Sequence, residues 1–307
     1  MADELRIVLL GKTGDGISSA GNTILGGDFF EVKCSPESTT QKCTVQSNKV
    51  NDRLISIIDT PGFFNTCLKE DELNHEIMRC MTECAPGPHA FVIVLRLGGY
   101  NDQEIVVVQK FLGEEAFRYA IILFTFGAEG IDANEYNIIE KVVATNGELK
   151  KLVEKCGGRC HVIDNKYWAE AQAGYMSNKT QVEELLKTVD KMVAINGGSC
   201  YTNSVLQVVD EEINEETAQL QKNENKGEKE NRQQAKENVL KNILAGMTGA
   251  IYGALFGLAI TFVTPNPALI IIKIVEEARD AIQVAKNEET IKSALYEVMK
   301  NIKVKLN

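Results

Sequence analysis

The feature that most constrains the fold is a glycine-rich loop that follows an apolar run near the start of the chain. Residues 5–10, Leu-Arg-Ile-Val-Leu-Leu, have the composition of a buried strand. They lead directly into the loop Gly11-Lys-Thr-Gly-Asp-Gly-Ile-Ser18, and the small residues that follow predict a helix. A strand, a glycine loop and a helix in this order bring the amides of the helix N-terminus to the loop, an arrangement that binds phosphate groups.

The rest of the first two thirds of the chain alternates between apolar runs and helical patterns. Runs that are apolar throughout indicate parallel strands buried on both faces, joined by crossover helices. The expected strands are 53–58, 90–95, 119–125 and 160–164, and the expected helices are 104–112, 134–155 and about 179–195. The predicted fold is therefore α/β, a doubly wound and mostly parallel sheet over residues 1–200. Ligands of such sheets bind at the carboxyl ends of the strands.

The composition changes after this domain. Residues 201–240 are rich in Glu, Lys, Asn and Gln, which predicts either a solvated polar helix or a partly disordered linker. Residues 241–307 form an apolar C-terminal region, in which 242–264 holds no charged residue. About 20 apolar residues suffice to cross a bilayer, so this segment is a candidate membrane contact. The alternative is a helix buried against the domain or a partner.

Charge and cysteine content limit the partners and the compartment. Lys and Arg total 33 against 43 Asp and Glu, a net charge of −10, which argues against nucleic acid as a partner. The eight cysteines are not arranged as a disulfide framework, and packing within helices explains the spacing of Cys80/Cys84 and Cys156/Cys160 more simply than a metal does. The first residues lack the apolar stretch of a signal peptide, so the expected location is cytoplasmic, with the tail as a contact to an intracellular membrane.

The loop matches the phosphate-binding pattern G-x-x-x-x-G-K-[ST] at every position except one. Gly11 and Gly16 supply the turns, and Ser18 is placed to ligate Mg²⁺. Ile17 occupies the lysine position, and Lys12 is the alternative source of a cation. The candidate nucleotide-binding residues are Gly11, Lys12, Thr13, Gly14, Asp15, Gly16, Ile17, Ser18 and Ser19.

A second motif, Asp59-Thr-Pro-Gly62, follows the strand expected at 53–58. A carboxylate at this place holds Mg²⁺, and the Gly62 amide can meet a γ-phosphate. The next residue is Phe63 in place of a glutamine that would orient water, so slow hydrolysis is expected.

Four motifs resemble the immunity-associated GTP-binding proteins (GIMAP, or AIG-type G domain). They are Gly11–Gly26, Asp59–Phe64, His89–Leu97 and Tyr119–Thr125, and they occur in order within about residues 5–195. The resemblance implies a P-loop NTPase fold of the Ras-like type with an α-helical C-terminal extension. It also implies Mg²⁺ with GTP or GDP as ligands, homo- or hetero-oligomers with related G domains, and frequent association of the C-terminal extension with intracellular membranes.

The resemblance also assigns single residues. Thr40, or its neighbour Thr39, fits the switch I threonine that reaches Mg²⁺, which gives Ser18, Thr40 and Asp59 as the metal set. Thr125 and Asn165 fit the motifs at the base.

Two positions depart from the family pattern. Ala128 replaces the aspartate that reads guanine, with Glu129 as a substitute, and Gly99 replaces an arginine. The losses at Ile17 and Ala128 together amount to about 3–6 kcal/mol, a weakening of about 10²- to 10⁴-fold. The sequence thus predicts a guanine-nucleotide-binding protein with weak or absent GTP hydrolysis. The alternatives are a nucleotide-independent pseudo-GTPase that acts as a dimerisation scaffold and, more remotely, a binder that tolerates ATP.

Overall fold

The computed structural model describes residues 4–32, 42–60, 70–125, 138–165, 177–223 and 227–246. The chain divides into two compact units. The first holds residues 1–68 and 87–201, and the second holds residues 69–86 and 202–307. Residues 69–86 therefore group with the second unit, although they lie within the span 1–200 that was expected to form one domain.

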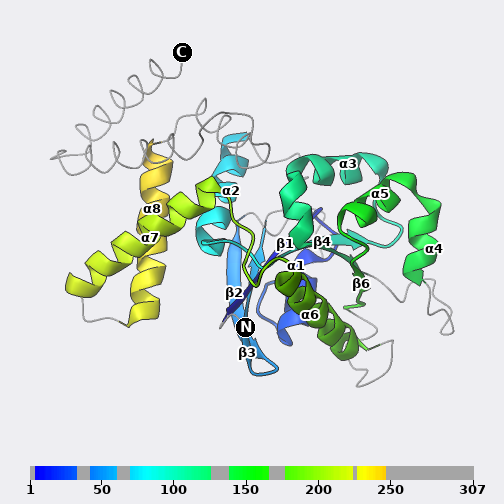
Figure 1. Cartoon of the computed structure of the whole chain (residues 1–307), viewed down its shortest axis with the longest axis horizontal. Coiled ribbons are helices and arrows are strands. Elements are labelled where there is room, and N and C mark those ends of the chain that lie inside the picture. Colours follow the sequence, from blue (N-terminus) through cyan, green and yellow to red (C-terminus); the bar gives the residue numbers. More distant parts are fainter. Residues whose placement is uncertain are drawn as a thin grey trace, which may run out of the picture. The chain divides into compact units, whose positions relative to one another are not determined.

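The first unit is built on a six-stranded sheet of order β2-β3-β1-β4-β5-β6 (Figure 1). All neighbouring pairs are parallel except β2–β3, which is antiparallel. The strands are β1 (Glu4–Gly11), β2 (Thr44–Val50), β3 (Arg53–Asp59), β4 (Ala90–Arg96), β5 (Ala120–Thr125) and β6 (Cys160–Val162). The predicted α/β fold with a mostly parallel sheet is confirmed, and the strand expected at 160–164 ends at Val162.

The apolar runs form the middle of this sheet because both of its faces are covered. Leu5, Ile7 and Leu9 of β1 belong to one buried cluster with residues of α1 (Ile17–Leu25) and α6 (Asn178–Ile195). The remaining helices of this unit are α3 (Asp102–Phe111), the short 3-10 helix η1 (Glu114–Tyr119), α4 (Ile138–Thr145) and α5 (Gly147–Lys155). Asn146 separates α4 from α5 and caps α5 by accepting a hydrogen bond from the Leu149 amide at 2.8 Å. The described part of the helix expected over 134–155 is thus divided in two at this cap.

The sequence analysis missed the edge strand β2, whose residues are half exposed or exposed along its whole length. Its polar side chains give no apolar pattern from which a strand could be predicted. Polar residues on an edge strand oppose pairing with the strand of another chain. The turn to β3 has only Asn51 and Asp52 at its centre, with φ angles of 48° and 62°. Two positive φ angles in a two-residue connection are typical of a type I′ hairpin, which sets the register of β2 on β3.

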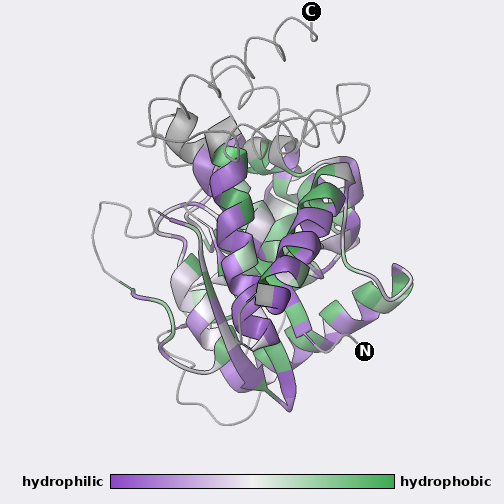
Figure 2. Cartoon of the chain, turned by 90° about the vertical axis from the view of Figure 1, so that its left-hand side faces the viewer, coloured by the Kyte–Doolittle hydropathy of each residue, from purple (hydrophilic) through white to green (hydrophobic). Residues whose placement is uncertain are grey.

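The second unit packs three helices together: α2 (Glu70–Cys84), α7 (Ser204–Asn223) and α8 (Glu228–Gly246). The sequence left a helix and a disordered linker as alternatives for residues 201–240, and the structure shows helices over 204–223 and from residue 228 onward. Hydrophilic and hydrophobic residues alternate along the helical ribbons (Figure 2). The apolar minority of α7 and α8 is buried, as at Val209, Ile213 and Val239. The Lys236 Nζ donates to the Glu83 carbonyl at 2.7 Å and so ties α8 to α2.

The apolar segment 242–264 is described only to residue 246, which ends α8, and its remainder lies outside the described residues. Among the helices that the structure describes, none combines the length and the apolar character that crossing a bilayer requires.

Candidate functional site

The loop Gly11–Ser18 joins the end of β1 to the start of α1, as the sequence predicted. Gly14 and Gly16 have φ angles of 94° and 84°, a conformation that favours glycine. A Cβ on Gly11 would approach the Val94 carbonyl oxygen to 2.6 Å, so the neighbouring strand β4 requires a glycine there. Gly16 is the N-cap of α1 and has no side chain to cap it, which leaves the first amides of the helix for an anion.

The predicted metal ligands Ser18 and Asp59 meet at the end of the loop. Parallel pairing of β1 with β3 places Asp59 beside Leu9, and the Ser18 hydroxyl donates to Asp59 Oδ2 at 2.6 Å. Asp59 is 1% exposed, and its Oδ1 atom has no hydrogen-bond partner among the described residues. Burial raises the pKa of this carboxyl from 3.8 to about 6, against the lowering effect of the Ser18 hydrogen bond.

This pair fits a hard divalent cation. A buried carboxylate oxygen with no hydrogen-bond partner in the described part of the chain and a neighbouring hydroxyl are oxygen ligands of the kind that Mg²⁺ prefers. Thr60 fixes the chain after Asp59, because its buried hydroxyl donates to the Leu9 carbonyl at 2.7 Å. Thr40, the third predicted ligand, and Thr39 lie outside the described residues, as does Gly62.

The residue at the lysine position of the loop is part of the apolar core. Ile17 is 7% exposed and belongs to the buried cluster between the sheet and helices α1 and α6. Its side chain lies against Gly11, since a Cβ on that glycine would come within 3.3 Å of it. The structure therefore shows a buried apolar side chain at the position where phosphate-binding loops have a lysine that contacts the phosphates.

The charged residues of the loop contact each other and α3. Lys12 Nζ forms an ion pair with Glu104 Oε1 at 2.6 Å. Asp15 is 4% exposed, and burial, with a smaller contribution from the Glu104 charge, raises the pKa of its carboxyl to about 6. The Asp15 carbonyl accepts a hydrogen bond from the buried Thr125 hydroxyl at 2.7 Å, which holds the loop against the end of β5.

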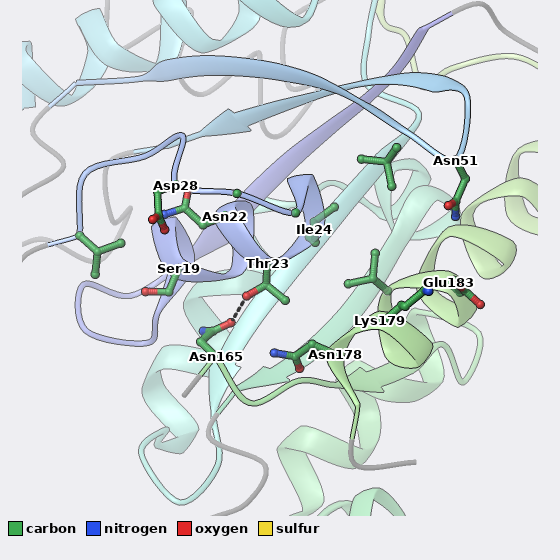
Figure 3. Close-up of a pocket in the computed structure, with 15 residues that line it drawn as sticks. Ser19, Asn22, Thr23, Ile24, Asp28, Asn51, Asn165, Asn178, Lys179 and Glu183 are labelled. Carbon is green, nitrogen blue, oxygen red and sulfur yellow. Dashed lines mark hydrogen bonds between the residues drawn. The ribbon is translucent and has the colours of Figure 1, made fainter. Parts of the chain in front are cut away.

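A pocket of about 570 Å³ lies next to the loop, between α1, α6 and the β2–β3 turn (Figure 3). Two predicted residues line it, Ser19 and Asn165. The Thr23 hydroxyl donates to Asn165 Oδ1 at 2.6 Å, so the Asn165 side chain is held against α1. The other polar side chains around it include Asn22, Asp28, Asn51, Asn178, Lys179 and Glu183. Ala128 and Glu129 lie outside the described residues.

Two contacts of the site were missed by sequence reasoning. Thr23 lies four positions after Ser19 and thus on the same side of α1, a spacing that could have drawn attention to it. Glu104 lies three positions after Asn101 and completes a capping box at the start of α3, with the Glu104 amide donating to Asn101 Oδ1 at 3.0 Å. The pattern Asn-x-x-Glu predicts such a box, but the sequence does not show that Lys12 reaches it.

The cysteines do not form a metal site in the described part of the chain. Cys80, Cys84 and Cys156 are buried, and no group of three or more histidine, cysteine or acidic side chains that could hold a metal occurs among the described residues. Burial raises the pKa values of Cys156 and Cys160 to about 12, which keeps these thiols protonated.

Comparison with known proteins finds relatives of this sequence. The human GTPase IMAP family member 8 is 34% identical over 203 residues, which are 65% of this chain and 29% of that protein. Immune-associated nucleotide-binding protein 10 of Arabidopsis thaliana is 31% identical over 215 residues, 68% of this chain and 45% of that protein. The chain thus spans less than half the length of these two relatives.

Solved structures and a family model complete the comparison. Toc33 from Arabidopsis thaliana, crystallised as a dimerisation-deficient mutant, aligns with a TM-score of 0.47 at 16% identity, covering 62% of this chain and 84% of that one. The model of the AIG1 family matches residues 5–224, which include every described residue of the loop, the Ser18–Asp59 pair and the pocket at Asn165. The chain belongs to the AIG1 family.

Proposed function

We propose that this chain binds Mg²⁺ together with GTP or GDP at the loop Gly11–Ser18 and hydrolyses GTP weakly or not at all. The observation that carries the proposal is the Ser18–Asp59 pair, because a buried carboxylate oxygen without a partner is costly unless a cation occupies the site. The printed names of the two relatives, a GTPase and a nucleotide-binding protein, support the same ligand class.

In this proposal each part of the site has a separate task. The loop amides and the N-terminus of α1 receive the phosphates. Ser18 and Asp59 hold Mg²⁺, which neutralises phosphate charge when it is bound. Ser19 and Asn165 line the pocket that would receive the sugar and the base, and Thr125 holds the loop beside it. The predicted contributions of Thr40 and Gly62 remain part of the proposal.

Weak hydrolysis follows from the missing cation. Charge that develops on the phosphates in the transition state is normally stabilised by a lysine of the loop. Ile17 supplies no charge at this position. Binding through backbone amides and Mg²⁺ is less affected than catalysis, because those groups do not depend on the lysine.

A second candidate is a nucleotide-independent module that forms dimers or larger assemblies with related G domains. The burial of Ile17 favours it, since this side chain improves the core and cannot contact phosphate. In either case we propose a G domain over residues 1–200 that is followed by the helical segment 201–240. The region 241–307 would then provide the contact to an intracellular membrane through 242–264.

The test is a titration of the full chain. We would first denature a purified sample and identify released nucleotide by anion-exchange chromatography. The remainder would be titrated with GTP, GDP and ATP by calorimetry, with Mg²⁺ and with EDTA. Mg²⁺-dependent binding of guanine nucleotide supports the proposal, whereas absence of heat up to millimolar ligand for the wild type and for Ile17→Lys supports the scaffold. Ala128→Asp should raise the preference for guanine over adenine nucleotides.

A further inference from the structure

The ion pair between Lys12 and Glu104 connects the phosphate loop to α3. Because Ile17 occupies the lysine position of the loop, Lys12 is the lysine side chain that the loop itself can offer to a phosphate. Lys12 is the only lysine or arginine within the loop Gly11–Ser18. Its side chain is 42% exposed and lies at the rim of a hollow of about 400 Å³. This hollow is lined by the loop residues Lys12–Asp15 on one side and by Arg96, the last residue of β4, with residues 97–99 on the other.

Glu104 is held in place without any help from Lys12. Its carboxylate accepts hydrogen bonds from the Asn101 amide at 3.2 Å and from Asn101 Nδ2 at 3.0 Å. It also lies in the first turn of α3, where the helix dipole favours a negative charge. If Lys12 leaves, Glu104 therefore keeps two donors and a favourable position, and it loses the lysine charge that offsets its repulsion with Asp15.

Lys12 is correspondingly free to change its partner. The Lys12 side chain is half-exposed, so water partly screens its ion pair with Glu104, whereas a hydrogen bond from an ammonium to a phosphate that carries more than one negative charge is strong. The hydrogen bond to Glu104 raises the pKa of Lys12, and a phosphate is also an anion that favours the charged form, so the lysine stays protonated in both situations. The hydrogen bond from Thr125 fixes the loop backbone at Asp15, so the backbone can keep its shape while the Lys12 side chain moves.

We propose that Lys12 is the replacement cation of this phosphate loop: it rests on Glu104 when no nucleotide is bound and moves to the outer phosphate of a bound nucleoside di- or triphosphate. Glu104 is then a positioning residue that competes with the phosphate for Lys12 and thereby lowers affinity. This inference rests on the proposed nucleotide binding. It also accounts for how a loop with Ile17 can retain affinity for the charged end of the ligand.

The test is a double-mutant cycle measured by calorimetry with GTP, GDP and GMP in the presence of Mg²⁺. Lys12→Met should weaken binding of GTP and GDP about tenfold or more and should change GMP binding less than twofold. Glu104→Gln keeps an acceptor for the capping box and should strengthen GTP binding severalfold. In the Lys12→Met background the same Glu104→Gln change should have no effect on GTP binding.

The matched control is another lysine–glutamate pair in the same unit, Lys151–Glu148 on α5, which is joined at 2.7 Å. Lys151→Met and Glu148→Gln remove the same charges and should leave all three affinities unchanged. Thermal unfolding of each variant shows whether it is folded, and Glu104→Gln remains informative if Lys12→Met is not.

The outcomes separate this inference from the proposed function. If the wild type binds GTP and Lys12→Met binds it equally well, the exchange of partners is refuted and nucleotide binding stands. Equal effects of Glu104→Gln with and without Lys12 would refute it too, because they indicate a general charge effect. If neither the wild type nor Ile17→Lys binds any of the three nucleotides, both the proposed function and this inference fail.

Discussion

Ile17→Lys should change stability and affinity in opposite directions, which makes it the sharpest test of the site. Ile17 is 7% exposed within the cluster that α1 and α6 form with the sheet. Burying such a side chain stabilises a protein by about 1.5–3 kcal/mol, and a lysine stem recovers only a part of this. For a unit of this size the melting temperature of the nucleotide-free protein should fall by about 3–12 °C.

The same substitution should strengthen nucleotide binding. A hydrogen bond from a charged donor contributes about 1.5–3 kcal/mol, which corresponds to an affinity for GTP higher by about tenfold to a hundredfold. Calorimetry measures the dissociation constant, and thermal scans with and without GTP measure the stability. Saturating nucleotide should return part of the lost melting temperature, because a ligand that binds only the folded state stabilises it.

Ile17→Met is the matched control for this prediction. Methionine keeps an apolar side chain of similar volume and should cost less than about 1.5 kcal/mol in stability. It brings no charge, so the affinity for GTP should remain at the wild-type value. Equal affinities for Ile17→Lys and Ile17→Met would refute the reasoning, because they would show that a cation at this position does not reach the phosphates.

Three further substitutions test separate parts of the structure. Asp59→Asn removes the buried carboxylate, so nucleotide affinity should become the same in Mg²⁺ and in EDTA; a remaining Mg²⁺ dependence would place the metal elsewhere. His89→Asn keeps an acceptor for the Arg6 amide but removes a ring whose pKa burial, together with the nearby Arg6 charge, lowers from 6.5 to about 4. Between these pH values the unfolded state binds more protons, so from pH 7 to pH 4.5 the wild type should lose about 2 kcal/mol of unfolding free energy relative to the variant. Urea unfolding measures this loss, and parallel pH profiles of the two proteins would contradict it. Asp52→Gly relieves a left-handed strain of about 1–2 kcal/mol and makes the unfolded chain more flexible at a cost of about 0.4–1 kcal/mol, so the free energy of unfolding in a urea titration should rise by about 1 kcal/mol or less. A decrease would show that the Lys49–Asp52 ion pair outweighs the strain.

The parts of the fold that the sequence predicts are those in which one local signal is strong. The parallel strands are apolar along most of their length because both faces of the sheet are covered, and few other arrangements of the chain produce such runs. Strand β2 gives no such signal, because it lies at the edge and carries polar residues. Helices α7 and α8 look solvated in the sequence, since their apolar minority becomes visible only when they pack on each other and on α2.

The site shows the same division between local and long-range information. Ser18 and Asp59 were identified because each belongs to a motif with a fixed place at the end of a strand, and the sheet register then brings them together. The contacts of Lys12 with Glu104 and of Thr23 with Asn165 join residues that are 92 and 142 positions apart. No local pattern encodes these pairings, so only the folded chain reveals that Lys12 has a partner.

The energetics of Ile17 and Asp59 together favour a site that still binds a ligand. Isoleucine at position 17 stabilises the nucleotide-free fold, so its presence alone would suit a scaffold. Asp59 has the opposite effect: burial raises its pKa from 3.8 to about 6, so the ionised carboxylate costs about 3 kcal/mol at neutral pH. This cost is absent below pH 3.8, where the carboxyl is protonated in both states, and it is complete once the pH has risen through 6, so the free energy of unfolding falls over this range. A scaffold gains nothing from a buried charge with an oxygen that lacks a partner among the described residues, whereas a site for Mg²⁺ and a nucleotide requires it.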